Sequence, residues 1–159
     1  MVYDYVETPV GMLFVAVEEG RVKRLTLSDI EWIEFSGALP GISRDTKQCR
    51  EAVNQLYEYF EGDRRVFTVP AAPIGPSFHQ MVWDRLREIP YGETRSYSDI
   101  ACSLGCPNAC RAVGRANGLN PIPIIIPCHR VVGKNGSLTG FRGGLPMKKY
   151  LLELERKYR

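Results

Sequence analysis

The spacing of apolar residues changes partway along this chain of 159 residues, and the change predicts two kinds of structure. Apolar and polar residues alternate in segments 1–7, 11–19 and 22–28, as they do in strands with one buried face. Apolar residues recur at helical spacing in 45–61 and again in 78–89. The sequence therefore predicts an α/β module, a small antiparallel sheet plus a helix, followed by a mainly α part.

Three prolines lie between Val69 and Ser77, where the two patterns meet. Proline breaks helices and lacks the amide that a central strand needs, so this stretch indicates a connection. We expect an α/β N-terminal domain over 1–70, a linker over 71–76 and a helical C-terminal domain over 77–159.

The composition is that of a globular protein. With 44% hydrophobic residues, a chain of this length can bury a core. No apolar run approaches the roughly 20 residues of a membrane helix, and the first residues lack an export signal. We therefore expect a cytoplasmic protein without a membrane partner. Its five cysteines, an odd number, are expected to stay reduced.

Charge is divided unevenly along the chain. Residues 1–76 contain 8 Lys or Arg against 12 Asp or Glu, whereas residues 77–159 contain 13 against 6. Between Arg95 and Lys149, eight basic residues accompany a single acidic one, Asp99. This excess indicates either a solvated basic face or a surface for a polyanion, of which nucleic acid is the commonest in a cell.

Residues 96–118 have the features of a helix-turn-helix. Ser96 and Asp99 have the spacing of a capping box, which predicts a first helix ending near residue 104. A glycine and a proline then interrupt the helix, and Asn108 is expected to cap a second helix that ends near residue 117. Two short helices are also common as plain structure, and only the basic surroundings favour DNA binding.

The second helix has an arginine face and a face suited to packing on the first helix. Arg111 and Arg115 lie four residues apart, on one side of the helix. Ala109, Val113 and Ala116 share the packing face. Cys110 and Gly114 are small and lie between the two faces, so the helix is expected to allow close approach of another surface.

Three cysteines of this segment, Cys102, Cys106 and Cys110, are spaced by four residues. A glycine and a proline interrupt the helix that would align their thiols, and the chain has only two histidines. We therefore predict no metal site here and three small, half-buried side chains.

A thiol and an imidazole are adjacent at Cys128 and His129, after the apolar run 124–126 that predicts a buried strand. A cysteine becomes nucleophilic when an imidazole, a cation or a helix N-terminus stabilises its thiolate. Neighbours on an extended chain point to opposite faces, so the pair needs a turn, which Pro127 favours. The alternative interpretation is a small core cysteine beside a surface histidine.

The last helix supplies a carboxylate that can orient the imidazole. Its apolar stripe turns Glu155 toward the interior and Glu153 nearly opposite. A buried carboxylate requires a partner, and an imidazole is a suitable one. Asn120 is expected either to brace a turn near these groups or to be an ordinary Asn-Pro turn residue.

Together these residues resemble the O6-alkylguanine-DNA alkyltransferases, also called methylated-DNA–protein-cysteine methyltransferases. The resemblance covers about residues 78–155 and rests on the motifs IPYGETRSY, RAVGRAN, NPIPIIIPCHRVVG and TGFRGGLPMKKYLLELE. It implies an N-terminal domain similar to ribonuclease H, and a helix-turn-helix that binds the minor groove of double-stranded DNA containing O6-alkylguanine.

The resemblance further implies DNA repair by direct reversal of damage, in a single-turnover reaction without a cofactor. Cys128 is implied to accept the alkyl group from O6 of guanine, and His129 to act through a water as the base. Glu155 is implied to orient the imidazole, and Asn120 to brace this relay. The protein is expected to work as a monomer with no obligate protein partner.

DNA contacts are implied as well. Arg111 is implied to fill the base stack when the damaged base is flipped out, and Tyr97 to assist the flipping. Val131 is implied to line the base pocket and to accept a hydrogen bond from guanine. The remaining implied contacts are Ser98, Ala109 and Cys110 on the helix-turn-helix, and Phe141 and Arg142 in the loop over the pocket.

Some positions depart from the family's common residues. Cys110 replaces a frequent alanine, whereas Phe141 and Arg142 replace a tyrosine and a small residue, so the loop bears on which adducts fit. No zinc site is implied, because Cys49 is the only cysteine of the N-terminal part and has no histidine near it.

Two other functions use the same residues. Cys128, His129 and Glu155 also suit a cysteine hydrolase or acyltransferase, which turns over repeatedly and leaves the basic helix-turn-helix unexplained. A non-catalytic DNA-lesion-binding protein is the second alternative, and relatives of that kind carry tryptophan in place of the nucleophile.

Overall fold

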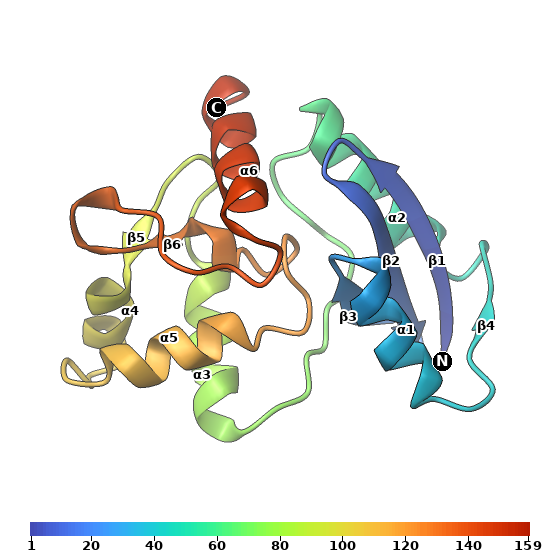
Figure 1. Ribbon diagram of the computed structural model, residues 1–159, viewed down its shortest axis with the longest axis horizontal. Coiled ribbons are helices and arrows are strands. Elements are labelled where there is room, and N and C mark those ends of the chain that lie inside the picture. The colour runs from blue at the N-terminus through green and yellow to red at the C-terminus, as the bar shows by residue number, and fades with distance from the viewer. The chain divides into compact units, whose positions relative to one another are not determined.

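The computed structural model describes residues 1–159, which form two compact units, Met1–Pro73 and Ile74–Arg159. The first is an α/β unit and the second is mainly helical (Figure 1), as the sequence predicts. None of the helices combines the length and the apolarity that crossing a membrane requires.

The sheet of the first unit contains the three predicted strands. β1 (Val2–Thr8), β2 (Gly11–Glu18) and β3 (Arg21–Thr26) pair antiparallel in chain order. A fourth strand, β4 (Ser43–Arg44), pairs parallel to β1 and gives the order β3-β2-β1-β4. The sheet is therefore mixed and not purely antiparallel as predicted. The sequence did not predict β4, because a strand of two residues is too short to show alternation.

The predicted helix of the first unit, α2 (Arg50–Glu61), contacts β1 and buries Leu56 and Phe60. It begins five residues later than predicted, at Arg50 instead of residue 45. The Asp45 carboxylate accepts a hydrogen bond from the amide of Gln48 at 3.0 Å. This local bond holds the chain in turns before the helix begins.

The sequence patterns did not predict α1 (Asp29–Gly37). Trp32 of this helix stacks on Phe14 of β2 with ring centroids 4.8 Å apart, whereas Ile30 and Ile33 are exposed. None of its side chains is fully buried. The helix therefore lacks the apolar stripe by which an amphipathic helix is recognised in a sequence.

The second unit is built from four helices and two short parallel strands. Trp83 is buried, and its indole nitrogen Nε1 donates to the carbonyl of Ala116 at 2.8 Å. This bond fixes the helix that carries Ala116 against the core. The elements are α3 (Ser77–Arg87), β5 (Arg95–Ser96), α4 (Tyr97–Ser103), α5 (Cys110–Gly118), β6 (Val131–Val132) and α6 (Leu145–Lys157).

The helix-turn-helix consists of α4 and α5, which contact each other. The predicted capping box is confirmed: the Ser96 hydroxyl accepts from the Asp99 amide at 3.0 Å, and the Asp99 carboxylate accepts from the Ser96 amide at 2.8 Å. The predicted cap at Asn108 is wrong, because α5 begins at Cys110 and Ala109 takes the cap position. The Ala109 amide closes a turn on a preceding carbonyl, which delays the start of the helix.

The cysteines of this motif are more exposed than predicted. Cys110 is half-buried, but Cys102 and Cys106 are exposed. Cys102 lies near the end of α4 and Cys106 in the turn before α5, where little of the chain covers them. The structure contains no group of three or more His, Cys, Asp or Glu side chains that could hold a metal ion.

The apolar run 124–126 is a buried turn and not the predicted strand. The Ile126 amide donates to the Ile122 carbonyl at 2.9 Å, and Ile124 has a φ of 72° in the left-handed region. The prolines on either side of this run, Pro123 and Pro127, lack the amide that a strand ladder needs, so the chain turns between them.

Removing the Ser96 side chain tests how much the capping box at the start of α4 contributes to stability. We expect Ser96→Ala to lower the free energy of unfolding by about 1 kcal/mol, because the Asp99 amide loses its acceptor. Ser77→Ala, an exposed serine in the first turn of α3, is the matched control. Urea unfolding followed by circular dichroism measures both, and equal stability of the two variants would contradict the prediction.

Candidate active site

The chain turns at the cysteine–histidine pair. Cys128, His129 and Arg130 form one turn of 3-10 helix, in which the Pro127 carbonyl accepts from the Arg130 amide at 3.0 Å. All three side chains are buried, with Cys128 4% exposed and His129 fully enclosed. The pair is therefore not held in the opposite-facing arrangement of an extended strand.

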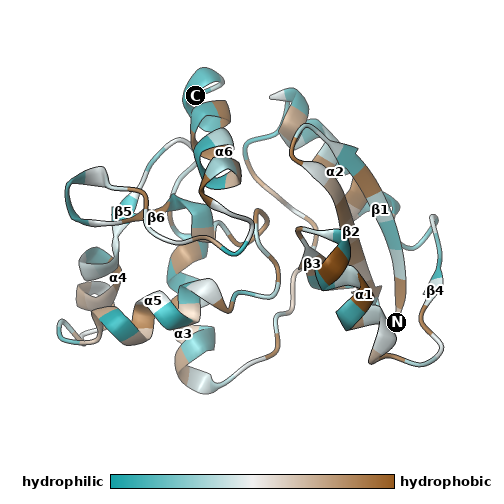
Figure 2. Cartoon of the chain, in the orientation of Figure 1, coloured by the Kyte–Doolittle hydropathy of each residue, from teal (hydrophilic) through white to brown (hydrophobic).

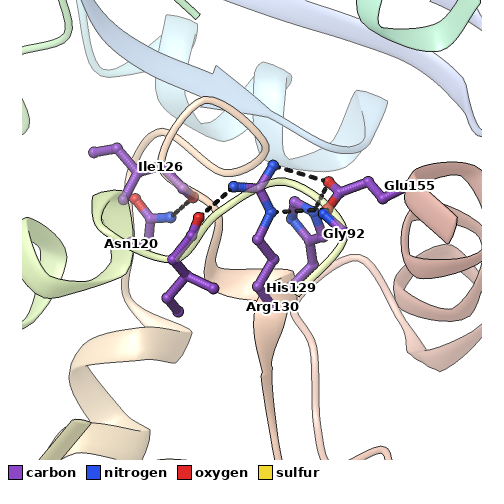
Figure 3. A network of polar contacts seen from close by, with 7 residues as sticks. Gly92, Asn120, Ile126, His129, Arg130 and Glu155 are labelled. Atoms are coloured by element: carbon purple, nitrogen blue, oxygen red, sulfur yellow. Dashed lines mark hydrogen bonds and ion pairs between the residues drawn. The ribbon is translucent and has the colours of Figure 1, made fainter. Parts of the chain in front are cut away.

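Glu155 of α6 lies at the centre of a polar network around this turn (Figure 3). Its Oε2 lies 2.6 Å from His129 Nε2 and 3.1 Å from Arg130 Nη2. Its Oε1 accepts from Arg130 Nε at 2.8 Å and from the Gly92 amide at 3.2 Å. Because Glu155 is only 1% exposed, these four contacts replace water around its charge.

The carboxylate of Glu155 is held in its ionised form. Burial acts to raise the pKa of Glu155, but the hydrogen bonds and charges of His129 and Arg130 outweigh burial and hold the pKa far below its usual value. Arg130 is itself fixed, since its guanidinium donates to the Ile89 carbonyl at 2.7 Å and lies over the ring of Tyr91. The network therefore contains a permanent ion pair.

The imidazole of His129 is neutral at pH 7. Burial lowers the pKa of His129, and although Glu155 opposes this effect, the charges of Arg130 and Lys148 reinforce it. Because Nε2 faces an ionised carboxylate, we assign the ring proton to Nε2. Nδ1 then keeps its lone pair, so the ring is able to accept a proton there.

Two buried asparagines hold the backbone around the turn. Asn120 donates from Nδ2 to the Ile126 carbonyl at 2.8 Å, and its Oδ1 accepts from the Ile122 amide at 3.0 Å. Asn117, near the end of α5, donates to the carbonyl of Cys128 itself at 3.3 Å. The sequence patterns point to Asn120 but not to Asn117, because an asparagine inside a helix carries no distinctive signal.

A buried lysine lies beside the turn, and the sequence patterns did not single it out. Lys148 of α6 is fully buried, and its Nζ donates to the Val131 carbonyl at 2.6 Å and to the Thr139 carbonyl at 3.2 Å. Burial lowers the pKa of Lys148, while the charge of a Cys128 thiolate acts to raise it. Lys148 and Glu155 are seven residues apart, which places them about 20° apart around the helix. The periodicity that predicts an inward position for Glu155 therefore predicts one for Lys148 as well.

The surroundings of Cys128 affect the pKa of its thiol in two opposite directions. Burial raises the pKa of Cys128, whereas a hydrogen bond from Asn120 and the charges of Arg142 and Lys148 act to lower it. The resting group is therefore a thiol, and three neighbours are in place to stabilise the thiolate once it forms.

The loop of residues 133–144, which follows the turn, is tied to the helix-turn-helix. The Tyr97 hydroxyl lies 2.7 Å from the Thr139 hydroxyl, and Lys148 holds the carbonyl of the same threonine. In this loop Phe141 is half-buried and Arg142 is exposed. The structure thus brings Tyr97 and this loop to the elements that carry the cysteine.

The other predicted contact residues lie on the surface of α4 and α5. The Ser98 hydroxyl lies 3.6 Å from Cys110 Sγ, Ala109 is half-buried and Arg111 is exposed. Hydrophobic and hydrophilic residues alternate along α5 (Figure 2), and Val113 is among those that pack inward. The predicted residues therefore fall into two sets. One set surrounds the buried thiol, and the other lies on the exposed surface of α4 and α5.

Comparison with known proteins identifies the family. Residues 77–157 match the DNA binding domain of 6-O-methylguanine DNA methyltransferase, and residues 1–73 match its ribonuclease-like domain. The chain belongs to the O6-methylguanine-DNA methyltransferase family. The second match also confirms the expected ribonuclease-like fold of the N-terminal part.

Individual members of the family are similar over nearly the whole chain. The constitutive methylated-DNA–protein-cysteine methyltransferase of Bacillus subtilis is 47% identical over 156 residues, covering 97% of this chain and 94% of that protein. The enzyme of Methanosarcina barkeri is 45% identical and covers 98% and 97%. A structure of the Mycobacterium tuberculosis member in complex with DNA has a TM-score of 0.90 at 42% identity, covering 99% of this chain and 94% of that one.

Neutralising Glu155 tests the network through its effect on stability. We expect Glu155→Gln to lower the free energy of unfolding at pH 7 by about 3 kcal/mol, because Arg130 stays buried without its counter-charge. The folded-state pKa of Glu155 lies below its unfolded value of 4.5. The stabilisation by the carboxylate is therefore complete above pH 4.5 and is lost as the pH falls below that value.

The two proteins should thus converge in acid, with a difference about 2 kcal/mol smaller at about pH 3 than at pH 7 in urea unfolding. Glu153→Gln, an exposed carboxylate two residues away, is the control and should change stability by less than about 0.5 kcal/mol at either pH. A difference that stays constant down to about pH 3 would show that Glu155 is not the ionised centre of the network.

Proposed function

We propose that Cys128 accepts an alkyl group from O6 of guanine in damaged DNA, in a single irreversible step. The class of reaction follows from the family: the chain is a methylated-DNA–protein-cysteine methyltransferase, which repairs DNA by alkyl transfer to a cysteine. The observation that carries the assignment to Cys128 is the 2.6 Å contact between His129 and Glu155, directly beside a buried thiol.

The other buried cysteine is a poor candidate. Burial raises the pKa of Cys49 to about 11, and the charges of Asp4 and Asp45 act in the same direction. Burial also raises the pKa of Cys128, but its neighbours differ from those of Cys49: an amide donor and two cations act to lower this pKa. Only the thiolate is an effective nucleophile, and the neighbouring charges stabilise a thiolate at Cys128 and oppose one at Cys49.

In the proposed reaction, Nδ1 of His129 takes the thiol proton through a water, and Glu155 stabilises the imidazolium that results. The thiolate sulfur bonds to the alkyl carbon as the bond from that carbon to O6 breaks, and the electron pair of that bond stays with guanine. The guanine anion takes a proton back, and the cysteine remains as a thioether. Each molecule acts once and needs no cofactor.

We propose that α4 and α5 dock in the minor groove of double-stranded DNA, with the damaged base flipped out. Arg111, at the exposed start of α5, fills the stack. It lies six residues, about 9 Å along the helix axis, from Asn117, which holds the Cys128 carbonyl. One helix would therefore connect the DNA surface to the nucleophile. The DNA complex of the Mycobacterium tuberculosis relative supports this proposal.

The flipped base is proposed to meet Tyr97 and Val131. Tyr97 exchanges its bond to Thr139 for a contact with the base. The Val131 carbonyl already accepts from Lys148 and has a second lone pair for the guanine amino group. The groove-facing residues complete the proposed interface: they are Ser98, Ala109 and Cys110, with Phe141 and Arg142 in the loop.

We further propose that the protein acts in the cytoplasm as a monomer, without an obligate protein partner. The thiol, the base, the orienting carboxylate and the helix-turn-helix all lie in the second unit of one chain. A reducing compartment keeps the acceptor thiol available.

Mass spectrometry after reaction with a duplex containing O6-methylguanine tests the acceptor. We expect each molecule to gain one methyl group, located on Cys128 by peptide mapping. Cys128→Ser should gain none, whereas Cys106→Ser, which removes an exposed cysteine, should react like the unmodified protein. A hydrolase would turn over without a stable adduct and a lesion-binding protein would stay unmodified; either result overturns the proposal.

The role of Arg111 is tested by comparing two substrates. Unstacking a base costs a few kcal/mol, so Arg111→Ala should slow transfer from duplex DNA by about 100-fold, with little effect on free O6-benzylguanine. Arg115→Ala removes the other exposed arginine of α5 and is the matched control. Quenched-flow kinetics measures both substrates, and equal slowing on duplex and free base would refute the role in the stack.

A further inference from the structure

Asn117 of α5 holds the peptide bond that joins the thiol residue to the imidazole residue. Its side chain is 5% exposed, and its Nδ2 donates to the carbonyl of Cys128 at 3.3 Å. That carbonyl belongs to the peptide unit between Cys128 and His129, which is planar and moves as one body. A bond to this single oxygen therefore restrains both residues at once.

The carbonyl of Cys128 is held from two directions. The Val131 amide donates to it at the end of the 3-10 turn, and Asn117 supplies the second donor from another element. A carbonyl oxygen has two lone pairs, so both are used. The Val131 bond closes the turn from within, whereas the Asn117 bond fixes the turn relative to α5.

The other end of the Asn117 amide is not satisfied. Its Oδ1 is buried and has no hydrogen-bond partner in the structure. A buried acceptor without a donor costs stability, and a leucine of similar size would avoid that cost. Asn120 differs, because both ends of its amide are hydrogen-bonded. The cost indicates that Asn117 is present for its bond to the turn and not for the stability of the core.

We propose that Asn117 is a positioning residue for the alkyl transfer, which holds the peptide unit of Cys128 and His129 in the orientation that lets the thiol proton reach the imidazole. The inference rests on the proposed function, because it concerns how Cys128 becomes a nucleophile. The role requires no contact of Asn117 with the alkyl group or with DNA. Loss of Asn117 should therefore slow removal of the thiol proton and spare the displacement by a thiolate that has already formed.

Transfer from free O6-benzylguanine tests this role without DNA, in single-turnover reactions between about pH 6 and about pH 9.5. Mass spectrometry of the benzylated protein gives an amplitude, which reports the folded fraction, and a rate constant, which reports the chemistry of the folded protein. The charged and titratable groups around the turn stay the same in every variant: His129 and Arg130 in the turn, Lys148 and Glu155 of α6, and Arg142 of the loop.

We expect Asn117→Leu to slow the reaction about ten-fold at pH 7, which is the effect of one hydrogen bond. The deficit should shrink as the pH rises, because hydroxide then removes the thiol proton without the imidazole. Looser packing alone would give the same deficit at every pH.

Asn117→Asp should show the opposite dependence on pH. The side chain has the same shape, and burial raises the pKa of its carboxyl group. The neutral form donates its O–H to the Cys128 carbonyl and keeps the rate close to that of the unmodified protein. The ionised form loses this donor and its charge opposes the thiolate, so the deficit should grow with pH to more than about ten-fold. Asn108→Asp places the same charge at an exposed position and should leave the rate unchanged.

The outcomes separate positioning from packing and from the reaction itself. A deficit that is constant over the pH range in both Asn117 variants, or rates equal to that of the unmodified protein, would overturn the positioning role while Cys128 still accepts the benzyl group. A protein whose Cys128 accepts neither this group nor methyl from a duplex containing O6-methylguanine would overturn the proposed function.

Discussion

The ion pair between Arg130 and Glu155 is the interaction on which the active site depends. A carboxylate in the protein interior is costly unless donors and a positive charge surround it, and Arg130 supplies both. Because Arg130 balances this charge, Glu155 can orient His129 without drawing a proton onto its second nitrogen. A base must be unprotonated to act, and the charge of Arg130 helps to keep His129 unprotonated by lowering its pKa.

The second unit separates the buried thiol and its polar partners from the exposed surface of α4 and α5, and it connects them through one helix. The thiol is buried in a turn, while the arginines of α5 face solvent. Asn117 joins the two, since it lies on α5 and holds the carbonyl of Cys128. On the other side, Lys148 joins the loop of residues 133–144 to β6 through two carbonyls. Side chains of α5 and α6 therefore hold the backbone on both sides of the turn that carries Cys128.

Local patterns in the sequence predicted the elements that have strong local signals. The three antiparallel strands and the capping box at Ser96 follow from alternation and residue chemistry, and the structure confirms them. The errors occur where local signals are weak or compete. Helix α1 has no apolar stripe. Asn108 does not cap α5, because a turn precedes the helix and Ala109 takes the cap position. The isoleucines between two prolines form a buried turn in place of a strand. Burial of that turn is a property of the packed unit, which periodicity does not encode.

The sequence by itself determined which groups the site contains. The motif around Cys128 indicates the thiol and the imidazole, and helical periodicity places Glu155 on the inward face of α6. Only the tertiary structure decided how these groups act. Protonation depends on burial and on charges far away along the chain: 25 residues separate Arg130 from Glu155, and 20 separate Lys148 from Cys128. Electrostatic free energy depends on distance in space and on exclusion of water, and neither quantity exists until the chain has folded.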